Sequence, residues 1–304
     1  MEKTAIERID YRNDISIKLV VPSECNASCP FCYCSKGHQS KAHYDQSAVD
    51  HFLSNYIRSI DHLLDKIDGR HPVSIDITGG EPTFNIPLLA EILRGLKMSG
   101  ITERVDRVVM TTNGYNLLDA IPYLEGTVNY INISLHDHRS EERNKILGFL
   151  KADDELHEIV SRLKSIGIKA SAVSVIHKPI NDFRTWMYDF IRWCKGIGFI
   201  ALRFRCDVFW NKQQQFDYYM SRTEKDPWFK VIDGGNAPDS LWRRLRGEDG
   251  FRVFFLHGVA DTSIISPGVE YIVADDGQAY ADYYKRTPIE HYKYPIGKVF
   301  DLIT

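Results

Sequence analysis

Three closely spaced cysteines are the residues of this sequence best suited to chemistry. Cys25, Cys29 and Cys32 follow the spacing C-x₃-C-x₂-C. Three thiolates on one tight loop can hold three irons of a cubane cluster, which leaves the fourth iron without a ligand from the loop and open to another molecule. The same spacing also suits a zinc site in which Cys34 or His38 supplies the fourth ligand. On spacing alone, both kinds of metal site stay open.

Two alternating periodicities predict the elements that must position this loop. Short apolar runs rich in β-branched residues predict strands, and apolar positions at helical spacing predict the helices between them. The predicted strands cover residues 15–21, 73–77, 108–111, 128–135, 170–176 and 200–204. The predicted helices cover residues 49–67, 88–96, 156–166 and 183–194. About six βα units therefore fill the first two-thirds of the chain, a pattern typical of a parallel sheet covered by helices.

Six units are too few for a closed eight-unit barrel, so a curved incomplete barrel and an open doubly wound sheet both fit. After residue 207 the chain becomes richer in aromatic residues and glycine breaks, and the turn sequence at 275–277 predicts a β-hairpin. We predict an α/β fold: a partial (β/α)6 TIM-like barrel over residues 1–207. An α+β extension over residues 208–304 would form a lid or a substrate wall.

Three further motifs follow the cysteines, each at the end of a predicted strand. Residues 78–83 read TGGEPT, residues 111–114 read TTNG, and residues 133–136 read ISLH. Ligand sites lie where the carboxyl ends of parallel strands meet, so these motifs should share one edge of the sheet. Together with the cysteine loop and Phe31 at its aromatic position, they resemble the signature of radical S-adenosylmethionine (SAM) enzymes. The resemblance covers about residues 15–206.

This resemblance implies both cofactors and a reaction type. The cofactors would be a [4Fe–4S] cluster on the three cysteines and SAM, whose amino and carboxylate groups chelate the open iron. One electron from the cluster would cleave SAM to methionine and a 5′-deoxyadenosyl radical, which then takes a hydrogen atom from the substrate. An electron donor such as flavodoxin or ferredoxin is implied as a partner.

The resemblance also implies which residues contact SAM. Backbone carbonyls of Gly79 and Gly80 and the carboxylate of Glu81 would meet the methionine ammonium, and a side chain at either glycine would block close backbone approach. Asn113 and Ser134 would hydrogen-bond the ribose or the methionine carboxylate. The ring of Phe31 would lie against the adenine.

Several polar residues near this edge have two interpretations each. Arg143 is either a ligand of the methionine carboxylate or a solvated helix residue. Arg203 and Arg205 share one face of a strand and either face inward to bind an anion or face outward over the helices. His136 and His177 end strands on the predicted edge and either contact the substrate or are structural.

The last third of the chain resembles a degenerate SPASM or twitch extension at residues 267–280 and 296–300. In relatives with such extensions, further cysteines bind auxiliary clusters. No cysteine follows Cys206, so we predict no auxiliary cluster here.

Composition and charge indicate which partners and which cell compartment are compatible with this protein. The formal net charge is −3, which argues against extended nucleic-acid binding. The first residues are charged where a signal peptide would be apolar, and no apolar run is long enough to span a bilayer. We therefore predict a cytoplasmic protein without membrane contact, whose reduced thiols are available as metal ligands.

The sequence predicts a radical SAM enzyme of oxidoreductase or lyase type that takes hydrogen from a small polar metabolite or nucleoside-like substrate. One alternative is a maturase of a ribosomally made peptide, which is disfavoured because the first strand begins near Ile15 and leaves no room for a leader-binding module. Another alternative is a non-catalytic, zinc-stabilised binding protein. The TGGEPT motif argues against it, because a structural metal needs no SAM-binding residues.

Overall fold

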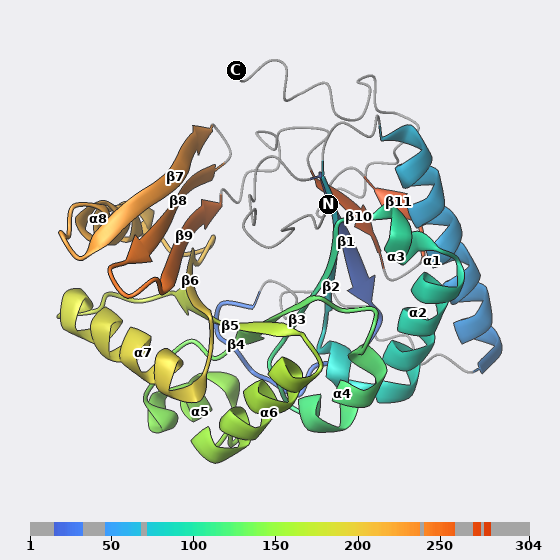
Figure 1. Cartoon of the computed structure of the whole chain (residues 1–304), viewed down its shortest axis with the longest axis horizontal. Coiled ribbons are helices and arrows are strands. Elements are labelled where there is room, and N and C mark those ends of the chain that lie inside the picture. Colours follow the sequence, from blue (N-terminus) through green and yellow to red (C-terminus); the bar gives the residue numbers. More distant parts are fainter. Residues whose placement is uncertain are drawn as a thin grey trace.

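The computed structural model describes residues 15–32, 46–67, 72–237, 240–258, 270–274 and 277–280. A single curved sheet of eleven strands forms the centre of this part of the chain, and helices line the outside of the curve (Figure 1). None of the described helices is both long and apolar enough to cross a membrane.

The six predicted strands are confirmed and pair in parallel, in chain order. They are β1 (Ile15–Val21), β2 (Val73–Gly79), β3 (Arg107–Thr112), β4 (Tyr130–Ser134), β5 (Lys169–Ile176) and β6 (Ala201–Cys206). The connecting helices are α1 (Gln46–Lys66), η2 (Pro82–Phe84), α2 (Ile86–Met98), α3 (Ile101–Arg104), α4 (Leu117–Leu124), α5 (Ser140–Leu147), α6 (Asp153–Ser165) and α7 (Phe183–Ile197).

Strands that follow residue 207 extend both edges of this sheet. After α8 (Gln213–Glu224), the chain forms β7 (Phe229–Ala237), β8 (Ser240–Gly247) and β9 (Arg252–Gly258). In the sheet, β9 pairs in parallel with β6, and β8 and then β7 follow as antiparallel strands. At the other edge, β10 (Glu270–Val273) pairs in parallel with β1. The predicted hairpin is confirmed, because β11 (Ala279–Tyr280) pairs with β10 in antiparallel orientation.

The described sheet is open, with β11 and β7 as its two edges. This agrees with the predicted partial barrel. The division of the chain at residue 207, and the role of the extension as a lid or wall, stay predictions.

The two faces of the sheet differ in chemistry. In β1, Ile15, Ile17 and Leu19 are fully buried in the hydrophobic core on the side of the helices. Fully burying each such side chain stabilises the fold by about 1.5–3 kcal/mol. The alternate residues face the other way, where the Ser16 hydroxyl donates to the Asp76 carboxylate of β2. We call this second side the inner face, and it carries the polar residues of the strands.

Candidate functional site

The cysteine loop begins where β1 ends, at the carboxyl edge of the parallel strands. Cys25, Cys29 and Cys32 are all partly exposed. The backbone N–H of Cys32 donates to the carbonyl of Cys29 at 3.1 Å and closes a turn. The backbone N–H of Ala27 lies 3.4 Å from the sulfur of Cys25. The loop thus turns back on itself, with its thiols near one another.

The thiols of this loop are suited to a cationic partner. Burial, together with the smaller effect of repulsion between thiolates at the neighbouring Cys32 and Cys25, raises the pKa of Cys29 to about 12. Burial also raises the pKa of Cys25, although the Ala27 N–H partly offsets this. Without a compensating cation these groups would hold their protons. Three soft sulfur donors on one loop fit an iron–sulfur cluster, whose irons stabilise the thiolates.

No three histidine, cysteine or acidic side chains among the described residues converge on a point that a single metal ion could occupy. A cubane cluster needs no such convergence, because each of three irons takes one thiolate. Cys34 and His38, the candidate fourth ligands of the zinc alternative, lie outside the described residues.

The glycine pair of the second motif packs against the cysteine loop. Gly79 has a φ of +139°, and a Cβ there would lie 2.4 Å from the carbonyl oxygen of Val21. A Cβ on Gly80 would lie 2.0 Å from the carbonyl oxygen of Ser23. Both distances are far below van der Waals contact. The sequence predicted close backbone approach at these glycines, and the approaching backbone in the structure is the chain's own.

Glu81 joins the second motif to the third. Its side chain is buried, and its Oε1 accepts hydrogen bonds from the N–H and hydroxyl of Thr83 at 2.9 and 2.7 Å and from the hydroxyl of Thr112. Its Oε2 accepts the backbone N–H of Asn113 at 2.6 Å. Burial raises the pKa of Glu81, while these donors lower it. Oε1 is saturated, and Oε2 alone keeps room for a further donor.

Asn113 connects the third motif to the cysteine loop. Its Oδ1 accepts the backbone N–H of Tyr115 at 3.0 Å, and its Nδ2 donates to the Oδ1 of Asn26 at 3.0 Å. The same Nδ2 lies 3.7 Å from the sulfur of Cys25. The predicted SAM ligand Asn113 therefore orders the loop around the cysteines, whatever it contacts in the bound state.

Ser134 differs from Asn113 in having no partner. It ends β4, is partly exposed, and its hydroxyl makes no hydrogen bond with any described residue. Its hydroxyl is therefore available to a ligand, as the sequence prediction requires.

Phe31 lies between two histidines from neighbouring strand ends. Its ring meets that of His136 edge-on, with centroids 4.7 Å apart, and lies 4.8 Å from that of His177. The fourth motif thus reaches the cysteine loop through an aromatic contact, and all four motifs lie together at one edge.

His136 has an unusual backbone and a fixed protonation state. Its φ of +69° is the only positive value among described residues other than glycine, a strained conformation of the kind found at functional sites. Burial lowers the pKa of His136 to about 3, so the ring is neutral. Its Nδ1 accepts the backbone N–H of Val175 at 3.2 Å, which places the proton on Nε2. No described residue accepts that proton.

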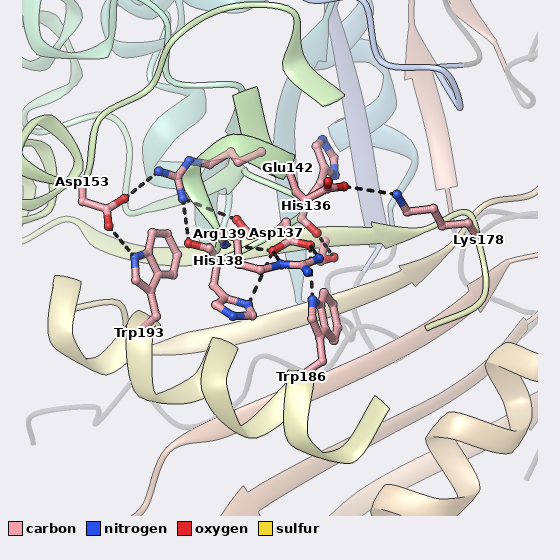
Figure 2. Close-up of polar contacts among 11 residues, drawn as sticks. His136, Asp137, His138, Arg139, Glu142, Asp153, Lys178, Trp186 and Trp193 are labelled. Carbon is pink, nitrogen blue, oxygen red and sulfur yellow. Dashed lines mark hydrogen bonds and ion pairs between the residues drawn. The ribbon is translucent and has the colours of Figure 1, made fainter. Parts of the chain in front are cut away.

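Arg143 is buried, which corrects the expectation of a solvated helix residue. One terminal nitrogen donates to Asp153 at 2.6 Å and to the carbonyl of Lys151 at 2.9 Å, and the other donates to the carbonyl of His138 at 3.1 Å. Both terminal nitrogens are thus occupied by the chain rather than by a ligand. Figure 2 shows this region, where Asp153 also accepts from Trp193.

The two arginines of β6 lie on the inner face. Leu202 and Phe204 of this strand belong to the hydrophobic core, so Arg203 and Arg205 point to the opposite side. The guanidinium of Arg203 lies 4.4 Å from the ring centroid of Phe254, a neighbour on the inner face. The inward orientation is therefore confirmed for this pair, while anion binding there stays a prediction.

Comparison with known proteins identifies the family. The sequence profile of the "Radical SAM superfamily" matches residues 19–191, more than half of the chain. The GTP 3′,8-cyclase of Aquifex aeolicus is 27% identical over 190 residues, which cover 62% of this chain and 55% of that protein. The GTP 3′,8-cyclase of Tolumonas auensis is 26% identical over 180 residues, or 59% of this chain and 49% of that protein. The chain spans about half the length of these curated relatives.

A comparable solved structure is Streptococcus suis SuiB bound to S-adenosylmethionine, with a TM-score of 0.49 and 14% identity over 69% of this chain and 44% of that chain. The profile match includes the cysteine loop and the three later motifs, which the structure brings to one edge of the sheet. The protein therefore belongs to the radical SAM superfamily, and it is an enzyme whose cofactors are a [4Fe–4S] cluster and SAM.

Proposed function

We propose that Cys25, Cys29 and Cys32 hold the [4Fe–4S] cluster and leave its fourth iron open to the amino and carboxylate groups of SAM. When bound, the cluster supplies one electron that splits SAM into methionine and a 5′-deoxyadenosyl radical, which takes a hydrogen atom from the substrate. The main support for the proposal is a chain of hydrogen bonds from Glu81 through Asn113 to Asn26. It connects the TGGEPT and TTNG motifs to the cysteine loop.

The chain's own residues would hold SAM around this loop. Backbone carbonyls of Gly79 and Gly80 and the Oε2 of Glu81 would accept the methionine ammonium. The Ser134 hydroxyl, which has no partner among the described residues, would bind the ribose or the methionine carboxylate. Asn113 would hold the cysteine loop in place while its amide adjusts to the same ligand.

The proposed substrate is a small polar or nucleoside-like molecule. The inner face below the cysteine loop carries polar side chains, such as Asn132 and Ser171, which are hydrogen-bonded to each other at 2.8 Å. A polar lining favours a polar substrate over an apolar one. The relatives named GTP 3′,8-cyclase are named for an activity on a nucleotide, which supports a nucleoside-like molecule as one member of this class.

We also propose that the enzyme works in the cytoplasm and takes its electron from a flavodoxin or a ferredoxin. A reducing compartment would keep Cys25, Cys29 and Cys32 available as cluster ligands, whereas an oxidising one would favour disulfides.

Metal analysis and product analysis of anaerobically purified protein test this function. We expect about four irons per chain and release of 5′-deoxyadenosine from SAM under a strong reductant. Cys29→Ala should abolish both. Cys194→Ala is the matched control, because Cys194 is buried in α7 and belongs to the core. Stoichiometric zinc in place of iron, or unchanged 5′-deoxyadenosine release in Cys29→Ala, would contradict the proposal.

A further inference from the structure

On the parallel strands β1 to β6 and β9, the inner face of the sheet is strongly basic. The charged residues on this face of β1 to β6 and β9 comprise six cations and one acid. The cations are Lys18, Arg107, Lys169, Arg203, Arg205 and Arg252, and the acid is Asp76. Asp76 forms an ion pair with Lys18 at the β1 side. Within these strands, no acidic residue on the inner face is left to balance the other cations.

Three of these cations form a column at the β6 side. Arg205 lies near the carboxyl end of β6, and Arg203 lies about 7 Å below it along the strand. Arg252 of β9 pairs with Ala201, two residues further down. Lys169 begins β5 next to this point, and its pKa is lowered by burial and by the charge of Arg252. Like charges therefore gather here without compensation from the strands.

The upper end of the column adjoins the cysteine loop. Arg205 lies opposite Val175 in the register of β5 and β6. The N–H of Val175 holds the ring of His136, and that ring contacts Phe31 between Cys29 and Cys32. Figure 2 shows the ring of His136 turned away from the contact between Asp137 and Trp186. Arg205 is thus one strand away from the residues that touch the cysteine loop.

Arg203 is already fixed in place, whereas Arg205 is not. The Nε of Arg203 donates to the hydroxyl of Ser171 at 2.9 Å, and its guanidinium packs between Tyr130 and Phe254. Arg205 is half-buried, and its side chain makes no ion pair or hydrogen bond with any described residue. The same holds for the side chains of Arg252 and Lys169.

Partly buried cations are costly unless an anion compensates them. A guanidinium also presents a fork of donors that matches a carboxylate or a phosphate. A concave surface with one sign of charge concentrates ligands of the other sign. Each of these arguments applies to the column that begins at Arg205.

We propose that the substrate carries a carboxylate or phosphate group that binds Arg205, with Arg203 and Arg252 below it on the inner face. The inference rests on the proposed function, since it assigns a substrate class to the same site. The anionic group would then lie near the carboxyl end of β6, and the hydrogen-donating carbon of the substrate would lie nearer to the cysteine loop.

Anion binding to the anaerobic holoenzyme tests this inference. Inorganic phosphate and succinate, titrated separately in the presence of SAM, serve as probes, and calorimetry reports their affinity while the visible absorbance reports an intact cluster. Arg205→Gln should weaken binding about 10-fold or more, because it removes a charge-assisted pair of hydrogen bonds. Arg205→Lys should retain part of the affinity. Arg162→Gln, on the exposed side of α6, should bind like the wild type.

The outcomes separate the two sources of the anionic group. Tighter binding of phosphate through Arg205 supports a phosphorylated substrate, and tighter binding of succinate supports a carboxylate. Absence of binding by both probes, or equal binding by Arg205→Gln and wild type, overturns the inference. Release of 5′-deoxyadenosine from SAM alone is measured in the same samples, so a failure of the radical reaction is seen independently of anion binding.

Discussion

At the level of single residues, the site depends on glycines that pass close to the chain's own backbone. Gly79 and Gly80 lie against Val21 and Ser23, which lead directly into the cysteine loop. The backbone N–H of Glu81 donates to the carbonyl of Glu24 at 3.0 Å in the same region. The second motif thus packs directly against the segment that leads into the cysteine loop.

Gly80→Ala should therefore damage the loop and not only SAM binding. Its Cβ would overlap the carbonyls of Ser23 and Glu24, and overpacking of this kind costs about 1–3 kcal/mol. We expect lower stability in chemical denaturation of the anaerobic protein and reduced iron content. Gly196→Ala in α7 is the control, since its Cβ meets no atom within 4 Å and should stabilise by about 0.5–1 kcal/mol. Full stability and iron loading of Gly80→Ala would refute this account.

His136 should give stability a pH dependence. Its pKa of about 3 in the folded protein is below the usual 6.5, so between these values the unfolded chain binds more protons. Stability from this group is therefore present above about pH 6.5 and is lost as pH falls, with a slope of up to about 1.4 kcal/mol per pH unit. Asparagine tolerates a positive φ, so His136→Asn should fold and show a shallower loss between pH 7.5 and 5. Parallel curves for variant and wild type would disprove the assignment.

At the level of elements, α5 links the helical layer to the cysteine loop. The backbone N–H of Ser28 donates to the carbonyl of Leu147, the last residue of α5, at 2.9 Å. Arg143 in the same helix holds the start of α6 through Asp153 and the carbonyl of Lys151. The position of α5 therefore affects the geometry around Cys29.

Arg143→Met should destabilise the fold by about 1–3 kcal/mol, because it leaves buried carbonyls of His138 and Lys151 without donors. Since α5 supports the loop at Ser28, we also expect slower or incomplete cluster reconstitution, measured by iron content over time. Arg162→Met, at an exposed pair with Glu158, should change stability by less than about 0.5 kcal/mol. Equal effects of the two substitutions would argue against the proposed link.

Local periodicity was sufficient to predict the parallel strands but not every helix. In β2 the apolar residues Val73, Ile75 and Ile77 alternate with polar ones, and β5 is a mostly buried stretch of small and apolar residues. The sequence predicts no bounds for α5, because SEERNKIL has little apolar periodicity, and none for α4, because it is short and contains Pro122. The pairing of β9 with β6 and of β10 with β1 joins distant segments, which local patterns do not report.

For the candidate site, as for the fold, the sequence predicts the location but not the internal contacts. The rule that ligand sites lie at the carboxyl ends of parallel strands was enough to bring the four motifs to one edge. Contacts between strand ends determine which residues Glu81 and Asn113 bind within the chain. They also determine the strained backbone of His136. Such contacts have no signature in spacing or composition.

At the level of the whole molecule, one open sheet carries a hydrophobic core on its helix side and a polar, basic inner face on the other. The carboxyl edge of that sheet holds the cysteine loop, and strands from the end of the chain extend both sides of the same surface (Figure 1). If the cysteine loop holds the cluster as proposed, this arrangement would place it above a surface suited to a polar, anionic molecule.

Electron paramagnetic resonance of the reduced anaerobic protein, recorded with and without SAM, tests the central claim most directly. If three cysteines leave one iron open, the spectrum of the reduced [4Fe–4S] cluster should change on addition of SAM, because the cofactor becomes a ligand of that iron. The signal should be absent in Cys29→Ala and present in Cys194→Ala. A cluster signal that is identical with and without saturating SAM would contradict the account.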